Sequence, residues 1–403
     1  MWEQIRSNQT RSAILVAVMA VLFLLIGYFF GLLFLENSIA GLIIALLLWA
    51  ILSLVAYLEG DAILLALSGA RKINREDHPR LYNIVEEMKL ASGLEAMPEV
   101  YIIDDPSPNA FATGRDPKKA SVAVTSGLLQ RLNRDELQGV IGHEMAHVQN
   151  RDVLLMALCS VLLGSIVIVA SYAPRFMLYG GMPKTRRNSS SRGGGSLQLV
   201  LLVVAILLMI VAPILAQLIY FALSRRREYL ADASSALYTR YPEGLASALE
   251  KIATSPIQLK SANNATAPMY IINPFRKKDR AASDLTSTHP PISERIRILR
   301  SMAGASFTDY EEAYRQVRGA KKGIIPTSTV AAAKSVSLRA AVSEAEEGAA
   351  LDEVERARET SDLMWRMGNY KTIDCECGTK LRVPPSYKEP SIVCPHCGRI
   401  NPI

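Results

Sequence analysis

Long uncharged stretches divide the chain into hydrophobic and polar parts. Four of them contain no Asp, Glu, Lys or Arg, and they cover residues 12–35, 37–58, 153–174 and 196–224. Each is longer than the roughly 18–20 apolar residues that a helix needs to cross the hydrocarbon core of a bilayer. The pattern therefore predicts about four transmembrane helices. The alternatives are buried core helices and, for residues 153–224, a pair that only dips into the membrane.

The polar stretch between the second and third hydrophobic segments predicts a small mixed domain. Apolar residues recur with helical spacing over residues 78–92. Residues 99–103 and 120–125 are short β-rich runs bounded by turn-forming residues. Asn133, with Glu136 three residues later, forms a capping box that begins another helix. We therefore expect a mainly α fold with a small β-sheet, which is the α+β class.

Basic residues flank the hydrophobic segments and contribute to a formal net charge of +7. By the positive-inside rule, their distribution places both termini and the polar stretch before residue 153 in the cytoplasm. The basic loop at residues 175–192 disagrees, because a chain with four transmembrane helices would place that loop outside. Anionic lipid at the membrane edges explains the excess charge most simply, so we expect no nucleic-acid partner.

The helix that begins after Asn133 carries an HExxH motif, with histidines at 143 and 147 and Glu144 between them. His143 and His147 lie one helical turn apart and can bind one metal ion from the same face. Catalytic zinc takes three protein ligands and keeps a fourth position for water, and Glu228 is the candidate third ligand. Asp232, four residues later, can hydrogen-bond a ligating imidazole. The alternative is that Glu228 and Asp232 only balance neighbouring arginines.

Further stretches resemble the HtpX-type membrane zinc metalloproteases over about residues 1–303. The segment Asn-Ala-Phe-Ala-Thr-Gly at 109–114 is similar to a family motif beside the strand that receives substrate. Residues 288–295, Thr-His-Pro-Pro-Ile-Ser-Glu-Arg, and residues 272–275, Ile-Asn-Pro-Phe, also match family elements. The resemblance implies an integral membrane metallopeptidase with a zincin-type fold.

The resemblance assigns roles to individual residues. It implies that His143, His147 and Glu228 bind catalytic Zn²⁺ and that Glu144 is the general base for a water molecule activated by the metal. It also implies a substrate-binding strand and two residues that stabilise the oxyanion of the reacting carbonyl. These are Asn109, Ala110 and Phe111 for the strand, and His289 and Arg295 for the oxyanion. Without the resemblance, His289 is more simply a turn residue before two prolines, and Arg295 is uninformative.

The expected function is proteolysis in the cytoplasmic (inner) membrane, with a multi-pass chain whose catalytic domain faces the cytoplasm. By family analogy, its substrates are misfolded or damaged membrane proteins, and its other partner is membrane lipid. Self-association into a homo-oligomer stays open. The alternative is a catalytically silent membrane scaffold or adaptor with structural zinc sites. A transporter is disfavoured, because the hydrophobic segments contain almost no ionisable residues.

Four of the five cysteines lie in two pairs near the C-terminus: Cys375 with Cys377, and Cys394 with Cys397. Four thiolates at this spacing can close a tetrahedral zinc site and stabilise a module too small to form a hydrophobic core. The pattern is therefore that of a zinc ribbon with a structural Zn²⁺. A redox dithiol at Cys394 and Cys397 is the alternative. No cysteine belongs to a pattern of secreted disulfide scaffolds, which fits a reducing compartment.

The predicted organisation has six parts. They are two N-terminal transmembrane helices (residues 1–69), the first part of a metallopeptidase domain with the HExxH helix (70–152), a hydrophobic helical pair (153–224), the second part of the metallopeptidase domain (225–303), a helical spacer (304–370) and a four-cysteine zinc-ribbon-like module (371–403). The spacer is expected to be helical because residues 329–366 are rich in Ala, Glu and Arg but poor in large apolar residues.

These two candidate sites predict a metal content of two zinc ions per chain. Removing residues 371–403 should lower that content to one, because the HExxH site lies entirely upstream. Elemental analysis of the purified full-length and shortened chains measures this directly. A full-length chain that holds one zinc ion, or a shortened chain that holds none, would contradict the two-site prediction.

Overall fold

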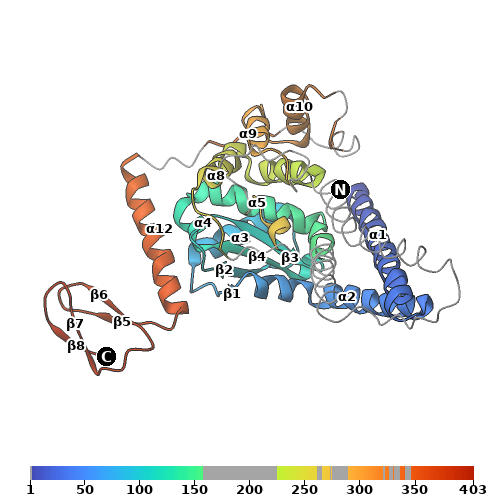
Figure 1. Cartoon of the computed structure of the whole chain (residues 1–403). Helices are drawn as coiled ribbons and strands as arrows, with labels where there is room; N and C mark the ends of the chain where they lie inside the picture. Colours follow the sequence, from blue (N-terminus) through green and yellow to red (C-terminus); the bar gives the residue numbers. More distant parts are fainter. Residues whose placement is uncertain are drawn as a thin grey trace.

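Helices pack around a small sheet at the centre of the molecule, with a long helical pair on one side and the C-terminal elements on the other (Figure 1). This computed structural model describes residues 2–157, 225–260, 266–272, 274, 289–320, 323–325, 330, 336–340 and 346–403. The expected mainly α architecture with a small sheet is confirmed across these residues.

The chain begins with two long helices, α1 (Trp2–Phe34) and α2 (Ser38–Leu67), which pack against each other. Their contact is closest at three glycines. A Cβ atom on Gly41 would lie 2.1 Å from the carbonyl oxygen of Gly27 and 2.5 Å from the Cα atom of Gly31. The two glycines of α1 are four residues apart, so they face α2 together and let the backbones approach.

Among the described residues, one helix is long and apolar enough to cross a membrane, and it is α2. α1 contains a shorter apolar stretch, Val16–Leu32. In α2 the side chains of Ile39 and Ile51 are 66% and 58% exposed, and exposed apolar surface on this scale favours a lipid environment. The expected third and fourth segments fall mainly in residues 158–224, outside the described residues. The total of four transmembrane helices therefore stays a prediction.

Four strands form the central sheet: β1 (Ala70–Lys72), β2 (Glu99–Ile103), β3 (Ala110–Gly114) and β4 (Ala120–Thr125). Their order is β1-β2-β4-β3, so β3 is an edge strand. β2 and β4 are parallel, whereas β3 pairs antiparallel with β4. The two β-rich runs expected from the sequence, 99–103 and 120–125, are confirmed.

Helices cover both faces of the sheet. The helices around it are α3 (Pro79–Ser92), α4 (Ser126–Arg131), α5 (Arg134–Gln149), helical residues 225–239, α8 (Pro242–Thr254) and α9 (Ile292–Arg300). On one face Val100 and Val122 join Ile141 of α5 in the main hydrophobic core. On the other face Leu64, near the C-terminal end of α2, lies with Phe111 in a second apolar cluster. The sheet therefore separates the HExxH helix from the helical pair.

The expected capping box begins α5. The Asn133 side chain accepts a hydrogen bond from the Glu136 N–H, and Glu136 accepts one from the Asn133 N–H, both at 2.9 Å. Glu136 also accepts a hydrogen bond from Lys251 of α8 at 2.8 Å. Gly139 lets α8 come close, because a Cβ atom there would lie 2.6 Å from the backbone nitrogen of Leu245. The capping box and the contacts with α8 thus fix the first two turns of α5, the helix that carries the HExxH motif.

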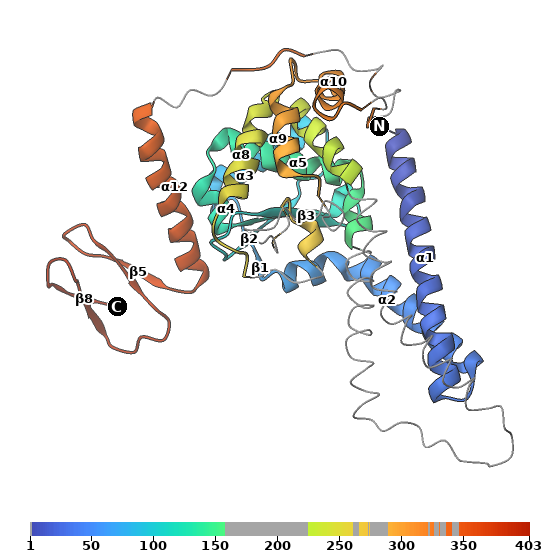
Figure 2. The ribbon, with the colours of Figure 1, turned by 45° about the horizontal axis from the view of Figure 1, so that its top comes forward.

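Residues after 303 pack into the main core, whereas the sequence predicted a spacer. Tyr310 of α10 (Phe307–Arg318) and Leu363 of α12 (Glu346–Met367) are both fully buried members of that core. Figure 2 shows α12 alongside the central unit, on the side away from α1 and α2. The apolar residues of this stretch are few, but several are large and lie on the helix faces that meet the core.

The chain between α10 and α12 also contacts the central unit. Residues 336–340 have no regular secondary structure, although the sequence predicted helix there. Arg339 donates hydrogen bonds to Asp135 at 2.6 Å and to the carbonyl oxygen of Thr239 at 2.9 Å. At the far end of α12, Arg366 donates to the carbonyl oxygen of Asp77. These contacts keep the C-terminal part of the chain against the central unit.

The last residues form two β-hairpins that lie beyond α12 (Figure 1). Their strands are β5 (Lys371–Asp374), β6 (Lys380–Val383), β7 (Ser391–Val393) and β8 (Ile400–Pro402). Gly378 and Gly398 have φ angles of 84° and 74°, a backbone conformation that glycine adopts without strain. Each glycine directly follows a cysteine, so the two hairpins have matching turns.

The helical pair yields a stability prediction. Gly41→Ala should lower the free energy of unfolding by about 1–3 kcal/mol, because its methyl group would overlap the backbone of α1. Gly60→Ala on the same helix is the matched control, since a Cβ atom there would lie 3.5 Å from Ala157, an ordinary contact. Chemical unfolding of the detergent-solubilised chain compares the two. Equal midpoints for both variants would contradict the close approach of α1 and α2.

Candidate metal centre

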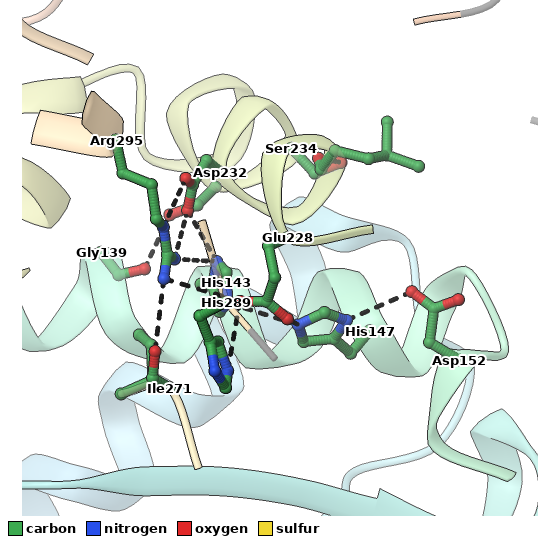
Figure 3. Close-up of polar contacts among 12 residues, drawn as sticks. Gly139, His143, His147, Asp152, Glu228, Asp232, Ser234, Ile271, His289 and Arg295 are labelled. Carbon is green, nitrogen blue, oxygen red and sulfur yellow. Dashed lines mark hydrogen bonds and ion pairs between the residues drawn. The ribbon is translucent and has the colours of Figure 1, made fainter. Parts of the chain in front are cut away.

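Two imidazoles of α5 and one carboxylate converge on a single point (Figure 3). The Nε2 atoms of His143 and His147 are 3.2 Å apart. Glu228, from helical residues 225–239, places its Oε2 atom 3.6 Å from His143 Nε2 and its Oε1 atom 3.4 Å from His147 Nε2. All three side chains are buried. The structure therefore brings together the three ligands that the sequence suggested.

These distances fit a zinc ion. Zinc binds nitrogen and carboxylate oxygen at about 2.0–2.1 Å in a tetrahedral arrangement, which places neighbouring ligand atoms roughly 3.3–3.4 Å apart. The three distances among the candidate ligand atoms lie close to this value. Within the described part of the chain, Glu228 Oε2 is buried and has no hydrogen-bond donor. A buried carboxylate oxygen without a donor is costly, and a bound cation removes that cost.

Two aspartates hold the histidine rings from behind. Asp232 Oδ1 lies 3.0 Å from His143 Nδ1, and Asp152 Oδ2 lies 3.2 Å from His147 Nδ1. Each carboxylate favours a proton on Nδ1, which leaves the Nε2 lone pair for a metal. The sequence suggested Asp232 for this position but not Asp152. Sequence reasoning missed Asp152 because the available signal was only its position, as the first acidic residue after the motif and just past the end of α5.

Arg295 lies behind the ligands. Its guanidinium donates to both Asp232 oxygens, at 2.8 and 2.7 Å, and to the carbonyl oxygen of Ile271 at 3.2 Å. The Nη1 atom is also 3.5 Å from Glu228 Oε2. Arg295 is fully buried. Asp232 and the Ile271 backbone thus engage the guanidinium, and the expected role of Arg295 at a reacting carbonyl stays a prediction.

His289 also lies beside the ligand carboxylate. Its Nε2 atom is 3.6 Å from Glu228 Oε2, and the side chain is 4% exposed. Burial lowers the pKa of His289 to about 4, although the charge of Glu228 opposes the shift. In its neutral form the ring can donate a hydrogen bond from one nitrogen.

Glu144 has the environment expected of a proton acceptor. Its Oε1 atom is buried and, among the described residues, has no hydrogen-bond partner. Burial raises the pKa of Glu144, while the charges of His143 and His147 and a hydrogen bond from the Ala112 N–H lower it in part. Burial also favours the neutral form of Glu228, but the adjacent His289, His143 and His147 hold its pKa well below the usual value. The two glutamates therefore differ in proton affinity.

The three expected substrate-strand residues lie at β3, where residues 271–272 cover part of the edge. The Asn109 side chain donates to the carbonyl oxygen of Ile272 at 3.0 Å. The carbonyl oxygen of Ala110 accepts the Ile271 N–H, also at 3.0 Å. Phe111 points to the opposite face of the sheet and packs edge-on against Tyr270, with ring centroids 5.2 Å apart. The covered edge is at Ala110, while Ala112 lies next to Glu144.

The four C-terminal cysteines form a second cluster. The Sγ atoms of Cys375 and Cys397 are 3.6 Å apart, and those of Cys377 and Cys394 are 3.7 Å apart. Zinc–sulfur bonds of about 2.3 Å in a tetrahedron place the sulfur atoms roughly 3.8 Å apart. Cys375 and Cys394 are buried, whereas the other two are exposed. The cluster therefore fits a zinc ion bound by four thiolates.

The HExxH helix, a third ligand from a separate helix and a general base beside them define a zinc metalloprotease site. Residues 75–303 match the model of peptidase family M48. The chain is 46% identical over 301 residues to a protease HtpX homolog from Dictyoglomus turgidum, covering 75% of this chain and 94% of that relative. A protease HtpX homolog from Lactobacillus helveticus is 42% identical over 302 residues, covering 75% of this chain and 100% of the relative. The chain therefore belongs to peptidase family M48, and it is an HtpX-type membrane metalloprotease.

One solved structure also resembles the chain. It is the crystal structure of S. mikatae Ste24p, with 18% identity and a TM-score of 0.39, covering 73% of this chain and 66% of that one.

Asp152 provides a test of the metal site. Asp152→Asn should weaken zinc binding about 10- to 100-fold, because the amide no longer fixes the His147 tautomer by charge. Asp104→Asn is a matched control on an exposed loop residue. Competition with a zinc chelator measures both affinities. Equal affinities in the two variants would show that Asp152 does not orient the ligand.

Proposed function

We propose that this metalloprotease is a zinc-dependent endopeptidase that cuts misfolded or damaged membrane proteins on the cytoplasmic side of the inner membrane. The observation that carries the proposal is the placement of Glu144 directly beside the His143, His147 and Glu228 ligand set, with one carboxylate oxygen unpaired. A purely structural zinc site needs no base and no vacant position beside its ligands.

The chemistry follows from the side chains around the site. Zinc held by the three ligands supplies Lewis-acid activation of water and of the scissile carbonyl. Glu144 accepts the proton of the attacking water at Oε1 and later donates it to the leaving amine nitrogen. His289 lies on the Glu228 side of the site, where an imidazole N–H would stabilise the oxyanion. Arg295 acts through Asp232. It holds the Asp232 carboxylate ionised and in place, and that carboxylate orients the His143 ring.

Substrate binding is proposed at the edge of β3. An extended peptide can add to an exposed edge strand through backbone hydrogen bonds, which impose little sequence preference. Ala112 lies on that edge next to Glu144, so a chain paired there would pass the catalytic base. This mode suits substrates that have lost their fold, because only unfolded segments present free backbone groups.

The proposed location follows from the surfaces of α1 and α2. The exposed apolar side chains of α2 suit lipid contact, and the charge distribution along the sequence favours a cytoplasmic catalytic unit. We also propose one catalytic zinc ion in the central unit and one structural zinc ion in the C-terminal hairpins. The proposed boundaries of the metallopeptidase domain are residues 70–152 and 225–303, with the helical pair 153–224 inserted between them.

A single substitution separates this function from a catalytically silent scaffold. Glu144→Gln should reduce cleavage of an unfolded protein substrate by about 10²- to 10⁴-fold, because general acid–base catalysis contributes a factor of that size. Its zinc content should stay unchanged, since Glu144 is not a ligand. Cleavage assays and elemental analysis of the detergent-solubilised chain measure both quantities. Equal cleavage by the wild type and Glu144→Gln would leave the scaffold as the better account.

A further inference from the structure

We propose that residues 304–320 and 323–325, which follow the family match, support the catalytic zinc site by fixing the two helices that carry Glu228 and Arg295. Tyr310 and Arg318 are the positioning residues of this support. The inference rests on the proposed function, because it deals with the same metal site. It gives the residues beyond the family match a role in metal binding and catalysis, where the sequence suggested only a spacer.

The first contacts flank the ligand Glu228. Two residues before it, Arg226 donates a hydrogen bond from Nε to the carbonyl oxygen of Ile324 at 2.8 Å. One residue after it, Tyr229 packs edge-on against Tyr314 of α10, with ring centroids 5.2 Å apart. Residues after 303 therefore contact the ligand-bearing helix on both sides of Glu228.

A second group of contacts links α10 to α9. Arg318 donates to Glu294 at 3.0 Å and to the Tyr229 hydroxyl at 3.2 Å. The Tyr229 hydroxyl in turn donates to Glu294. Glu294 directly precedes Arg295, and Tyr229 directly follows Glu228. Arg318 thus connects helical residues 225–239, which carry Glu228, to α9, which carries Arg295.

Tyr310 acts from the interior. It is fully buried. Burial and, to a lesser extent, the nearby charge of Asp232 raise the pKa of Tyr310 well above the usual value. In the described structure its hydroxyl has no hydrogen-bond partner, so the ring contributes by packing and by excluding water. The Asp232–Arg295 ion pair is stronger when water is excluded, because the local dielectric is lower. That pair orients His143.

Hydrogen bonds within this segment fix its own shape. Ser306 caps α10 by accepting the Asp309 N–H, and Glu311 accepts the N–H groups of Ile324 and Ile325, both at 3.0 Å. Ile325 is a member of the main hydrophobic core. The turn that carries the Ile324 carbonyl is therefore fixed to α10. The hydrogen bond from Arg226 to Ile324 and the packing of Tyr229 against Tyr314 are thus coupled through α10.

The family match ends at residue 303, and the two HtpX homologues compared above align with about 300 residues of this chain. Residues 304–325 therefore lie outside the matched family domain. These contacts around Glu228 and Arg295 are therefore made by residues that the family model does not match. Loosening them should change the metal site even though none of these residues is a ligand.

The experiment uses the full-length chain in detergent, loaded with cobalt(II). The absorption of cobalt distinguishes the nitrogen and oxygen site from the four-thiolate site. Arg318→Gln and Tyr310→Ala should lose cobalt from the HExxH site to excess chelator about tenfold faster than the wild type, as expected when an outer support of a ligand is removed. Their kcat should fall with KM unchanged, because the substrate pairs with β3. Tyr310→Phe, which restores the ring, should restore slow cobalt loss.

Glu312→Gln is the matched control, since Glu312 is exposed on the same helix and makes no side-chain contact with the described residues around Glu228 and Arg295. Should Arg318→Gln lose cobalt no faster than Glu312→Gln, the inference is wrong, whatever happens to thermal stability. Arg318 is partly exposed, so this comparison stands even if Tyr310→Ala fails to fold. Cobalt loss is measured without substrate. A chain that retains metal normally but cleaves nothing would contradict the proposed function and leave the inference intact.

Discussion

The structure depends on keeping four buried carboxylates together at one place. Glu144, Glu228, Asp152 and Asp232 all lie within the site around the two imidazoles, and each is nearly or fully inaccessible to water. Burying a charge is costly unless an opposite charge compensates it. Arg295 compensates Asp232, and a divalent cation bound between the histidines would compensate Glu228. The fold is therefore a frame that gathers negative charge, neutralises part of it with a guanidinium and would neutralise more with a metal ion.

Three distant parts of the chain make this frame. α5 supplies both histidines and Glu144 in a single helical turn, and its start is fixed by a capping box and by close contact with α8. Helical residues 225–239 supply Glu228 and Asp232 one turn apart, so one ligand and one supporting carboxylate arrive together. α9 supplies Arg295. The order of the sheet leaves β3 at the edge beside Glu144, which places the backbone proposed to receive a peptide next to the proposed base.

Local rules predicted the parts of the site that lie close in sequence. Helical spacing gave the histidine pair, and the Asn133 capping signal gave the start of their helix. The strands at 99–103 and 120–125 followed from β-rich composition between turns. Contacts between distant residues were beyond such rules. Asp152 lies beside His147 because the chain turns just after α5, where Arg151 has a positive φ, and Tyr310 is buried because α10 packs against α9. Because residues 304–370 contain few apolar residues, the sequence predicted a spacer. The aromatic side chains of Tyr310 and Tyr314 nevertheless pack into the core.

The hydrogen bond from Ile271 to Ala110 has a consequence for solubility. An enzyme that offers a sheet edge to unfolded chains also offers that edge to other copies of itself, and unpaired edges are the usual starting points of aggregation. β3 has five residues, and its outward-facing carbonyl at Ala110 is already occupied by the chain's own backbone. All five residues of β3 are buried, so the strand gives other copies of the chain little backbone with which to build a growing stack of strands. The edge proposed to receive a substrate is therefore protected against self-association.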